Sequence, residues 1–347
     1  MTPIILDANF NRIAELDDFI SFIWTTRYYS AGDFELCADI SRVGALPIGY
    51  YVTRKEDDTH VGIIESVSVQ RTEEARDMVI ASGRFLPAFL ARRIIPGQTQ
   101  LSGLVTDGIE TLINDNAISP ENTDRAIDGM TFTCEATTTE EMEVQYTGVN
   151  LLETIEAICE TYGIGLDCTL GENNSFDVRI YEGVDRSYNQ TENPYIVFSD
   201  LNDNLLTSSY GENRTTYVTD VLVGGEGTGT SQTLVWSAKD SQTGLDRYEE
   251  YLDASNAVTN DHIVTQQVYE QQLNELGLQE IAQNTFTEAF QGEVDFANVK
   301  LGVDVNVGDI CTIENSRWGV YINSRLVEVI ESIDEEGAYS ATPTFGA

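Results

Sequence analysis

The stretch LDANFNRIAELDDFISFIWTTRYYSAGDFELC, residues 6–37, decides how the first part of this chain folds. Its second half holds an aromatic and basic strand pattern, residues 24–29, and an alternating strand pattern, residues 34–36. Gly32 and Asp33 stand between the two patterns. Two strand patterns around a tight Gly-Asp turn predict a β-hairpin. On its own such a hairpin is typical of the edge of a β-domain.

The length and composition favour a globular protein of two to four domains. The chain has 347 residues, of which 41% are hydrophobic and 9% aromatic, enough apolar surface to build several cores. No run of about 18 apolar residues occurs, so we expect no membrane-spanning helix. The opening sequence MTPIILDANF has neither a basic region nor a small-residue cleavage site. It therefore predicts no secretory signal and a protein made in the cytoplasm.

The net charge of −39 at pH 7 is extreme, with 58 acidic residues and 19 basic ones. A surface of this charge repels DNA, RNA and anionic lipid, so we expect no specific nucleic-acid binding. Two explanations stay open at this point. The carboxylates could line a channel through which DNA passes without adhering, or they could serve solubility in a saline habitat.

The five cysteines are scattered, odd in number and contain no CxxC pair. This pattern predicts buried free thiols rather than a disulfide framework or a zinc site. They are Cys37, Cys134, Cys159, Cys168 and Cys311.

Periodicity predicts a chain that is α+β and mainly β, with two β-barrel-like domains around an α+β middle domain. Residues 1–100 predict a small barrel or split barrel with a helical lid at residues 86–95. Its expected strands cover residues 19–29, 33–39, 50–53, 62–70 and 77–84.

Residues 101–200 predict the α+β domain, in which residues 150–162 form an amphipathic helix that ends at Gly163. A second helix is expected at residues 103–116. The expected strands cover residues 130–136, 143–146, 164–170 and 176–182, with a turn at GENNS.

Residues 201–257 predict a β segment that contributes to a barrel, with strands at residues 205–210, 216–224 and 232–237. Residues 258–290 predict a helical segment over 260–289, divided at Gly277 and with glutamines on its outer face. Residues 291–347 predict the C-terminal barrel-like domain. Its expected strands cover residues 292–299, 310–314, 319–330 and 338–344. The glycines of residues 224–231 predict a hairpin tip, since no Lys-Ser/Thr follows them as in a phosphate loop.

The residue types indicate no catalytic, cofactor-binding or metal site. His60 lies in an acidic turn and His262 at the start of a polar helix, and each is expected to be a surface histidine. Carboxylates are so numerous that a hydrolase with paired acids stays open by residue type alone. The candidate acids, expected to be solvated, are Asp7, Asp17, Asp18, Glu73, Glu74, Glu140, Glu141 and Glu143. The oxygen-rich run at residues 200–204 is the nearest approach to a calcium loop, and it lacks the EF-hand pattern.

Several stretches, taken in order, resemble a family of siphovirus tail proteins, the hub-like proteins at the distal tip of phage tails. The first is W…RYY…GDFEL in residues 24–36, followed by GIIES (62–66) and SGRFLPAFLARRII (82–95). TGVNLLETIEAICETYGIGLD (147–167) and YEGVDRSYNQTENPYIVFSDLNDNLLTSSY (181–210) resemble the most distinctive blocks. VNVGDICTI (305–313), VEVIES (327–332) and PTFG (343–346) resemble the closing β-domain. The resemblance covers most of the chain, and the acidity is a departure from it.

The resemblance implies a structural, non-enzymatic role in the virion tail. It implies a homotrimer in which two similar β-domains per chain imitate a six-fold ring around a channel for DNA ejection. It also implies partners: a distal tail protein, the tail tube or tape measure, and the tip or receptor-binding proteins. It implies neither a cofactor nor a membrane anchor. The alternatives are a tail-associated hydrolase of host cell wall or surface glycan, and an adhesin, which the absence of a signal and an anchor disfavours. The chain stops where the hub-like region ends, so we expect no appended hydrolase domain.

Overall fold

The computed structural model describes residues 1–71, 77–202, 204–206, 209–240, 242–255, 265–284, 287–291, 294 and 299–346. The fold is mainly β with three α-helices among these residues, which confirms the α+β, mainly β class. The strands of the described residues form sheets of ten, four, three, three and two strands. None of the described helices is long and apolar enough to cross a bilayer.

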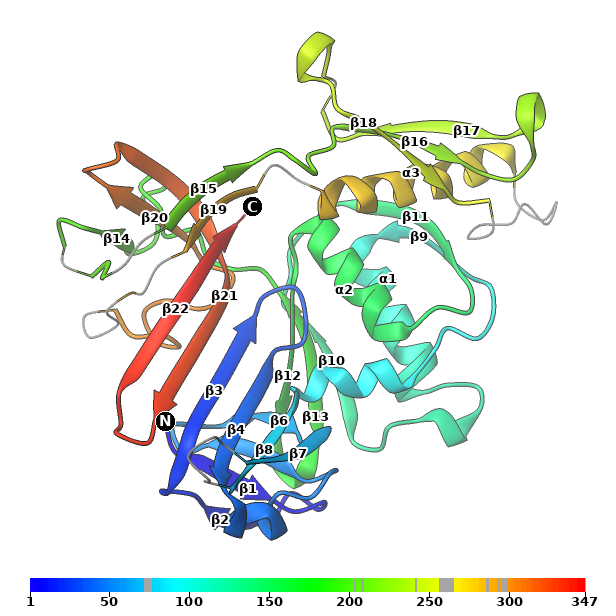
Figure 1. Ribbon diagram of the computed structural model, residues 1–347. Coiled ribbons are helices and arrows are strands. Elements are labelled where there is room, and N and C mark those ends of the chain that lie inside the picture. Colours follow the sequence, from blue (N-terminus) through cyan, green and yellow to red (C-terminus); the bar gives the residue numbers. More distant parts are fainter. Residues whose placement is uncertain are drawn as a thin grey trace.

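The largest sheet combines strands from both ends of the chain (Figure 1). Its main path runs β15-β19-β22-β21-β3-β4-β8-β7, and β14 and β20 attach beside β21. The strands are β3 (Phe19–Arg27), β4 (Asp33–Asp39), β7 (Ser66–Arg71), β8 (Asp77–Arg84), β14 (Val197–Ser199), β15 (Ser209–Asn213), β19 (Thr287–Gln291), β20 (Ile310–Asn315), β21 (Val320–Asp334) and β22 (Tyr339–Gly346). The N-terminal hairpin and the C-terminal hairpin are therefore neighbours in one sheet.

The predicted hairpin is confirmed, but the tight Gly-Asp turn and the place at the edge of a sheet are wrong. Asp33 is the first residue of β4, and residues 28–32 connect the two strands. β3 pairs antiparallel with β4, with Trp24 opposite Phe34 and Thr25 opposite Asp33. The other side of β3 pairs with β21, from Arg27 opposite Glu328 onward. Both rings, Trp24 and Phe34, are buried. Strands with partners on both sides and buried aromatic side chains lie in the interior of a sheet.

A four-stranded sheet packs against the N-terminal part of the large sheet. Its order is β2-β1-β5-β6, with β1 (Pro3–Leu6), β2 (Arg12–Glu15), β5 (Tyr51–Arg54) and β6 (Asp57–Ile63). The two sheets share a core that includes Ile5, Val52, Phe22, Trp24 and Val79. Strand pairing closes no barrel in the described part of the chain, so the predicted pair of barrels is not confirmed.

The chain crosses between these two sheets where the sequence predicted one strand over residues 62–70. The Ile64 N–H donates at 2.8 Å to the carbonyl of Tyr50, the residue before β5 of the four-stranded sheet. The next N–H, that of Glu65, donates at 3.0 Å to the carbonyl of Ser82 in β8 of the large sheet. The alternating pattern continues through the crossing, so one predicted strand is two, β6 and β7. The predicted lid is a 3₁₀-helix, Leu86–Arg92, and other short 3₁₀ turns lie at Ile40–Ala45, Thr123–Arg125, Glu172–Asn174, Gly229–Ser231 and Gly244–Asp246.

The middle of the chain, from β9 to β13, contains both strands and helices, and we call it the middle unit. Its strands are β9 (Thr99–Leu104), β10 (Met130–Cys134), β11 (Glu141–Tyr146), β12 (Gly165–Leu170) and β13 (Phe176–Tyr181), and its helices are α1 (Val105–Ile113), continued by a π-turn at Asn114–Ile118, and α2 (Leu151–Tyr162). The Asn150 side chain caps α2 by accepting from two backbone N–H groups, and Gly163 ends it with φ +70. The end of the helix at Gly163 was predicted from the sequence, and the cap at Asn150 is seen in the structure.

The remaining unit is a three-stranded sheet with α3 (Gln266–Gln283) on one face (Figure 1). Its order is β17-β16-β18, with β16 (Asp220–Gly224), β17 (Leu234–Ala238) and β18 (Glu249–Asp253). The glycine-rich residues 224–231 connect β16 to β17, as predicted. The strands β1, β2, β9, β14 and β18 were not predicted.

The helix α3 corrects two expectations. It runs through Gly277 without a break. A Cβ atom at this position would lie 2.3 Å from Ser237 Oγ, so the glycine allows the helix to pack closely on the sheet. Gln272 is fully buried rather than on an outer polar face. The predicted helix end at residue 289 is wrong, since residues 287–291 form β19. Its predicted start at residue 260 lies outside the described residues, as does most of the predicted strand 292–299.

Candidate functional site at the junction of three chain regions

Tyr28 lies just past β3, fully buried between two glycines from distant parts of the chain. A Cβ atom on Gly165, the first residue of β12, would lie 2.4 Å from Cε2 of the Tyr28 ring. A Cβ atom on Gly308, before β20, would lie at the same distance. Gly308 also has φ +104, a conformation that residues with a side chain rarely adopt. The ring therefore fits because both neighbours are glycines.

The Tyr28 hydroxyl is bonded within this packing. It donates toward the Gly163 carbonyl oxygen at 3.0 Å and accepts from the Gly183 N–H at 3.1 Å. The Arg325 guanidinium lies over the ring, 5.0 Å from its centroid. Burial raises the pKa of Tyr28, so the hydroxyl keeps its proton and remains a donor at neutral pH.

The backbone of Tyr28 connects the same regions. Its N–H donates to the Val327 carbonyl in β21 at 2.9 Å, and its carbonyl accepts from the Leu166 N–H in β12 at 2.8 Å. One residue thus joins the N-terminal hairpin, the middle unit and the C-terminal hairpin. We call this arrangement the Tyr28 junction and define it as Tyr28, Gly163, Gly165, Gly183 and Gly308.

Asp309 reinforces the junction from the C-terminal side. Its carboxylate is 2% exposed and accepts from Arg186 Nε at 2.8 Å. It also accepts from the backbone N–H groups of Val184 at 2.8 Å and Asn306 at 3.0 Å. A buried carboxylate is stable only when its charge is paired and hydrogen-bonded, and Asp309 meets both conditions.

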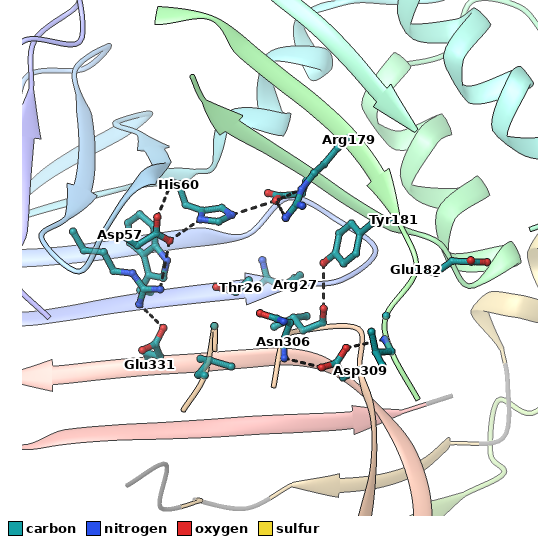
Figure 2. Close-up of a pocket in the computed structure, with 18 residues that line it drawn as sticks. Thr26, Arg27, Asp57, His60, Arg179, Tyr181, Glu182, Asn306, Asp309 and Glu331 are labelled. Carbon is teal, nitrogen blue, oxygen red and sulfur yellow. Dashed lines mark hydrogen bonds and ion pairs between the residues drawn. The ribbon is translucent and has the colours of Figure 1, made fainter. Parts of the chain in front are cut away.

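A cleft of about 400 Å³ lies beside the junction (Figure 2). Figure 2 shows Asp57, His60 and Arg179 along one side and Asn306 and Asp309 along the other. Its charged lining residues come from all three regions of the chain: Arg27, Arg54, Asp57, His60, Asp167, Arg179, Glu182, Asp309 and Glu331.

His60 bridges two carboxylates in this cleft instead of standing free on the surface. Its Nδ1 lies 2.6 Å from the Asp57 carboxylate in its own strand β6, and its Nε2 lies 3.2 Å from the Asp167 carboxylate in β12. Arg179 donates to the same Asp167 oxygen at 2.8 and 3.0 Å. We call Asp57, His60, Asp167 and Arg179 the histidine cluster. It connects the four-stranded sheet to the middle unit.

The protonation states of the histidine cluster are held by these contacts. Burial would lower the pKa of His60, but the hydrogen bonds to Asp167 and Asp57 outweigh it and raise the pKa to about 10. Burial opposes ionisation of Asp167, yet the contacts with His60 and Arg179 lower its pKa to about 2. The pKa of Asp57 is also well below its usual range, since the His60 contact outweighs burial.

These protonation states suit a structural ion network. A general acid or base works best with a pKa near the operating pH, whereas here the imidazolium stays charged and both carboxylates stay ionised at neutral pH. The ion pairs that line the cleft hold different regions of the chain together. Its geometry therefore gives no support to a hydrolase with paired carboxylates.

The structure does not bring the candidate acids together. Asp7 lies in the β1–β2 turn, where the hydrogen bonds from Asn11 lower its pKa, and Asp18 pairs with Arg42 on the surface. Asp17, Glu140 and Glu141 are exposed, and Glu143 is half-buried in β11 and accepts from Gln100. Glu73, Glu74 and His262 lie outside the described residues. Among the described residues, no group of three or more His, Cys, Asp or Glu could hold a metal ion.

The oxygen-rich run at residues 200–204 ties its own loop together. Asp200 accepts from the Ser316 N–H at 3.0 Å and from its hydroxyl at 2.7 Å. The Asn204 side chain is buried, accepts from Ser199 N–H and donates to the Val197 carbonyl, each at 2.8 Å. Asp203 lies outside the described residues.

The five cysteines are free thiols, as predicted. Four are buried, namely Cys37, Cys159, Cys168 and Cys311. Cys134 is exposed in β10, which corrects the expectation for that residue.

The residues of the Tyr28 junction and the histidine cluster were not identified as a site from the sequence. A signal for the junction was nonetheless present, because its parts lie in stretches quoted above: RYY at residues 27–29, YEGVDR at 181–186 and VGD at 307–309. The histidine cluster gave no such signal, because Asp167 lies 107 residues after His60 in the sequence.

Comparison with protein families gives a match over nearly the whole chain. The model of the family described as Siphovirus ReqiPepy6 Gp37-like protein matches residues 2–347. No curated protein matches the sequence.

Solved structures share the fold at low sequence identity. The tail protein from Neisseria meningitidis MC58 has a TM-score of 0.61 at 13% identity, over 100% of this chain and 96% of that one. The prophage MuSo2 43 kDa tail protein from Shewanella oneidensis has a TM-score of 0.61 at 12% identity, over 99% and 98%. The prophage tail protein gp18 from Listeria monocytogenes EGD-e has a TM-score of 0.55 at 13% identity, over 99% and 94%.

Proposed function

Because the chain belongs to the Siphovirus ReqiPepy6 Gp37-like protein family, a siphovirus tail protein family, we propose that it is a hub at the tip of the virion tail. Its place is the virion tail. The hub would be a trimeric ring that adapts the tail tube to the tip or receptor-binding proteins and forms part of the channel for DNA ejection. The role is structural, and no catalytic residue is assigned.

The observation that carries this proposal is the ten-stranded sheet built from both ends of the chain. Its main path ends at β7 on one side and at β15 on the other, and each of these strands has one pairing partner along that path. Unpaired strand edges are sites for pairing with another chain. In a closed ring, the β7 edge of one subunit meets the β15 edge of the next, and no edge of either kind remains.

The Tyr28 junction supports the same role. A ring subunit has to transmit load between its parts without bending, and the junction connects three chain regions through packing, hydrogen bonds and buried charge. The two β-rich ends of the chain, held in one sheet, would form the ring. The middle unit and the β16–β18 unit would lie at its periphery.

The test is the oligomeric state of the purified chain, measured by mass photometry. A trimer has a mass of about 115 kDa, three times 38.4 kDa. Val69 in β7 is 57% exposed at the sheet edge, and we expect Val69→Lys to shift the population toward monomer because charge blocks edge pairing. Ile48→Lys, at a 68% exposed site in a loop, is the matched control and should leave the trimer intact. A chain that is monomeric both alone and within the assembled particle would refute the proposal.

The charge of the chain makes a separate prediction about assembly. A trimer carries −117, three times −39. Salt or divalent cations screen such repulsion, so trimer formation should strengthen as ionic strength rises. We propose that the channel wall carries more Asp and Glu than Arg, so that DNA passes without adhering. Assembly that weakens steadily from low to moderate salt, or a channel lined mainly by Arg, would contradict this.

A further inference from the structure

The outer face of the β16–β18 sheet carries a row of two exposed aromatic side chains and one half-buried leucine. In the antiparallel and parallel pairings, Leu222 of β16 stands opposite Trp236 of β17 and opposite Tyr251 of β18. Residues opposite one another in neighbouring strands share a face of the sheet. Trp236 and Tyr251 are 49% and 51% exposed. We call Leu222, Trp236 and Tyr251 the aromatic row.

The opposite face of this sheet is already covered. The residues that alternate with the row, Val223 and Ser237, contact α3, and Ser237 Oγ donates to the Asn274 carbonyl at 3.0 Å. Figure 1 shows α3 on one side of β16–β18 and open space on the other, in a part of the molecule that projects from the large sheet. The aromatic row therefore faces outward.

Both exposed rings are held in place by neighbouring residues. The Arg247 guanidinium lies over the Trp236 ring, 4.8 Å from its centroid, and is itself paired with Asp220 and Glu249. The Tyr251 hydroxyl accepts from Gln232 Nε2 at 3.2 Å.

Tyr251 also lies close over the backbone of the neighbouring strand. A Cβ atom on Gly224 would be 2.1 Å from the Tyr251 hydroxyl oxygen. Exposed side chains that are already fixed lose little entropy on binding, which is the property of a preorganised binding surface.

From this face we propose that the aromatic row binds a neutral oligosaccharide. Trp236 and Tyr251 are two strands apart, about 10 Å at the usual inter-strand spacing, which suits two sugar rings of one extended chain that are separated by a third ring. Flat aromatic rings offer apolar area to the C–H faces of sugars. The Tyr251 hydroxyl, the Gln232 amide and the Glu249 carboxylate surround them with hydrogen-bonding groups for sugar hydroxyls.

The charges around the aromatic row favour a neutral oligosaccharide over an anionic polymer, a second copy of the chain or a cationic peptide. The strands β16, β17 and β18 contain no Lys or Arg, and Arg247 is neutralised by its two acids. Lys239, which follows β17, lines a different cleft, which lies between α2 and α3. An anionic polymer finds no unpaired cation here and meets a chain of net charge −39. A second copy would bring the same acids face to face. Arg247 already neutralises the Asp220 and Glu249 carboxylates that would attract a cationic peptide, whereas Trp236 keeps 49% of its surface exposed beside Arg247.

The experiment measures binding of the full-length chain to an array of neutral and anionic oligosaccharides, followed by calorimetry with the neutral oligosaccharide that binds best. We expect neutral glycans to bind, and Trp236→Ala or Tyr251→Ala to weaken binding about tenfold or more, as for central aromatic contacts. Trp318→Ala is the matched control, since Trp318 is 51% exposed outside this face, and it should bind like wild type. Trp236→Phe retains an aromatic ring and should keep part of the affinity, and circular dichroism confirms that each variant is folded.

Three binding results would overturn the inference: no neutral glycan bound, anionic glycans bound preferentially, or equal losses of affinity in Trp236→Ala and Trp318→Ala. Trimer formation should be unchanged in Trp236→Ala, so failure of glycan binding is distinguishable from failure of the proposed tail-hub role. Loss of the trimer in this variant, with folding intact, would assign the face to contact between subunits and would also overturn the inference.

Discussion

Replacement of His60 by glutamine tests whether the histidine cluster stabilises the fold through its charge. The pKa of His60 rises from an ordinary 6.5 to about 10 in the folded protein. A pKa difference of this size corresponds to at most about 5 kcal/mol of folding free energy. The side chain keeps 28% of its surface exposed, and solvent screens part of the interaction. We therefore expect His60→Gln to lower the free energy of unfolding by about 2–3 kcal/mol at pH values below the ordinary pKa.

The dependence on pH has a definite sign. Because the folded-state pKa of His60 is raised, its contribution to the free energy of unfolding is complete below about pH 6.5. That contribution is lost as the pH rises toward 10. The pKa values of Asp57 and Asp167 are lowered from 3.8, so their contribution is complete above that value and is lost as the pH falls below it. The cluster should stabilise wild type most between about pH 4 and pH 6.5. In His60→Gln, the free energy of unfolding should no longer fall as the pH rises from 6.5 toward 10.

Urea unfolding at a series of pH values, followed by tryptophan fluorescence, measures this effect. Trp24 is fully buried and lines the same cleft, so its emission reports the loss of structure there. Lys55→Gln is the control, because it removes a positive charge near β6 from a side chain that is 61% exposed and should change stability little. The chain has two histidines, and NMR should show one imidazole that does not titrate near neutral pH. The reasoning is refuted if His60→Gln keeps the wild-type alkaline decline, or if both histidines titrate near 6.5.

Three further outcomes are expected. Tyr28→Phe should lower the free energy of unfolding by about 1–3 kcal/mol, because the Gly183 N–H loses its acceptor, and an unchanged urea midpoint would contradict this. Gly277→Ala should lower the melting temperature although alanine favours helices, since its Cβ would lie 2.3 Å from Ser237 Oγ; Gly44→Ala, with no atom within 4 Å, is the control. A thiol reagent should modify Cys134 rapidly in the native chain and all five cysteines after denaturation, and rapid modification of a second native thiol would contradict the assigned burial.

The features that could be predicted from the sequence are those that depend on near neighbours. The helix predicted at residues 150–162 is α2, and it ends at Gly163, as its local pattern indicated. The hairpin of β3 and β4 follows from two short patterns. In each case, the residues that decide the structure lie within a few positions of one another.

The features that could not be predicted depend on partners far away in the chain. Nothing near residues 19–27 shows that β21 pairs with β3 and makes it an interior strand. His60 in an acidic turn has the pattern of a solvated residue, and its bridging role depends on Asp167. Gly277 has the pattern of a helix break, and the packing of α3 on β17 overrides it. The two glycines that enclose the Tyr28 ring, Gly165 and Gly308, lie far from it in the sequence, so the local pattern around Tyr28 does not show the packing.

The pairing of β3 with β21 also sets the order of events during synthesis. Arg27 meets Glu328, a partner that leaves the ribosome about 300 residues later, or roughly 15–60 s at ordinary elongation rates. Throughout that interval β4 can cover one side of β3, while the other side presents open backbone and the apolar stretch FISFIW. An unpaired strand edge of this kind favours aggregation, so a nascent chain needs protection until β21 emerges. A product truncated before Val320 never covers that edge, and it should be removed by aggregation or proteolysis before it can enter a particle.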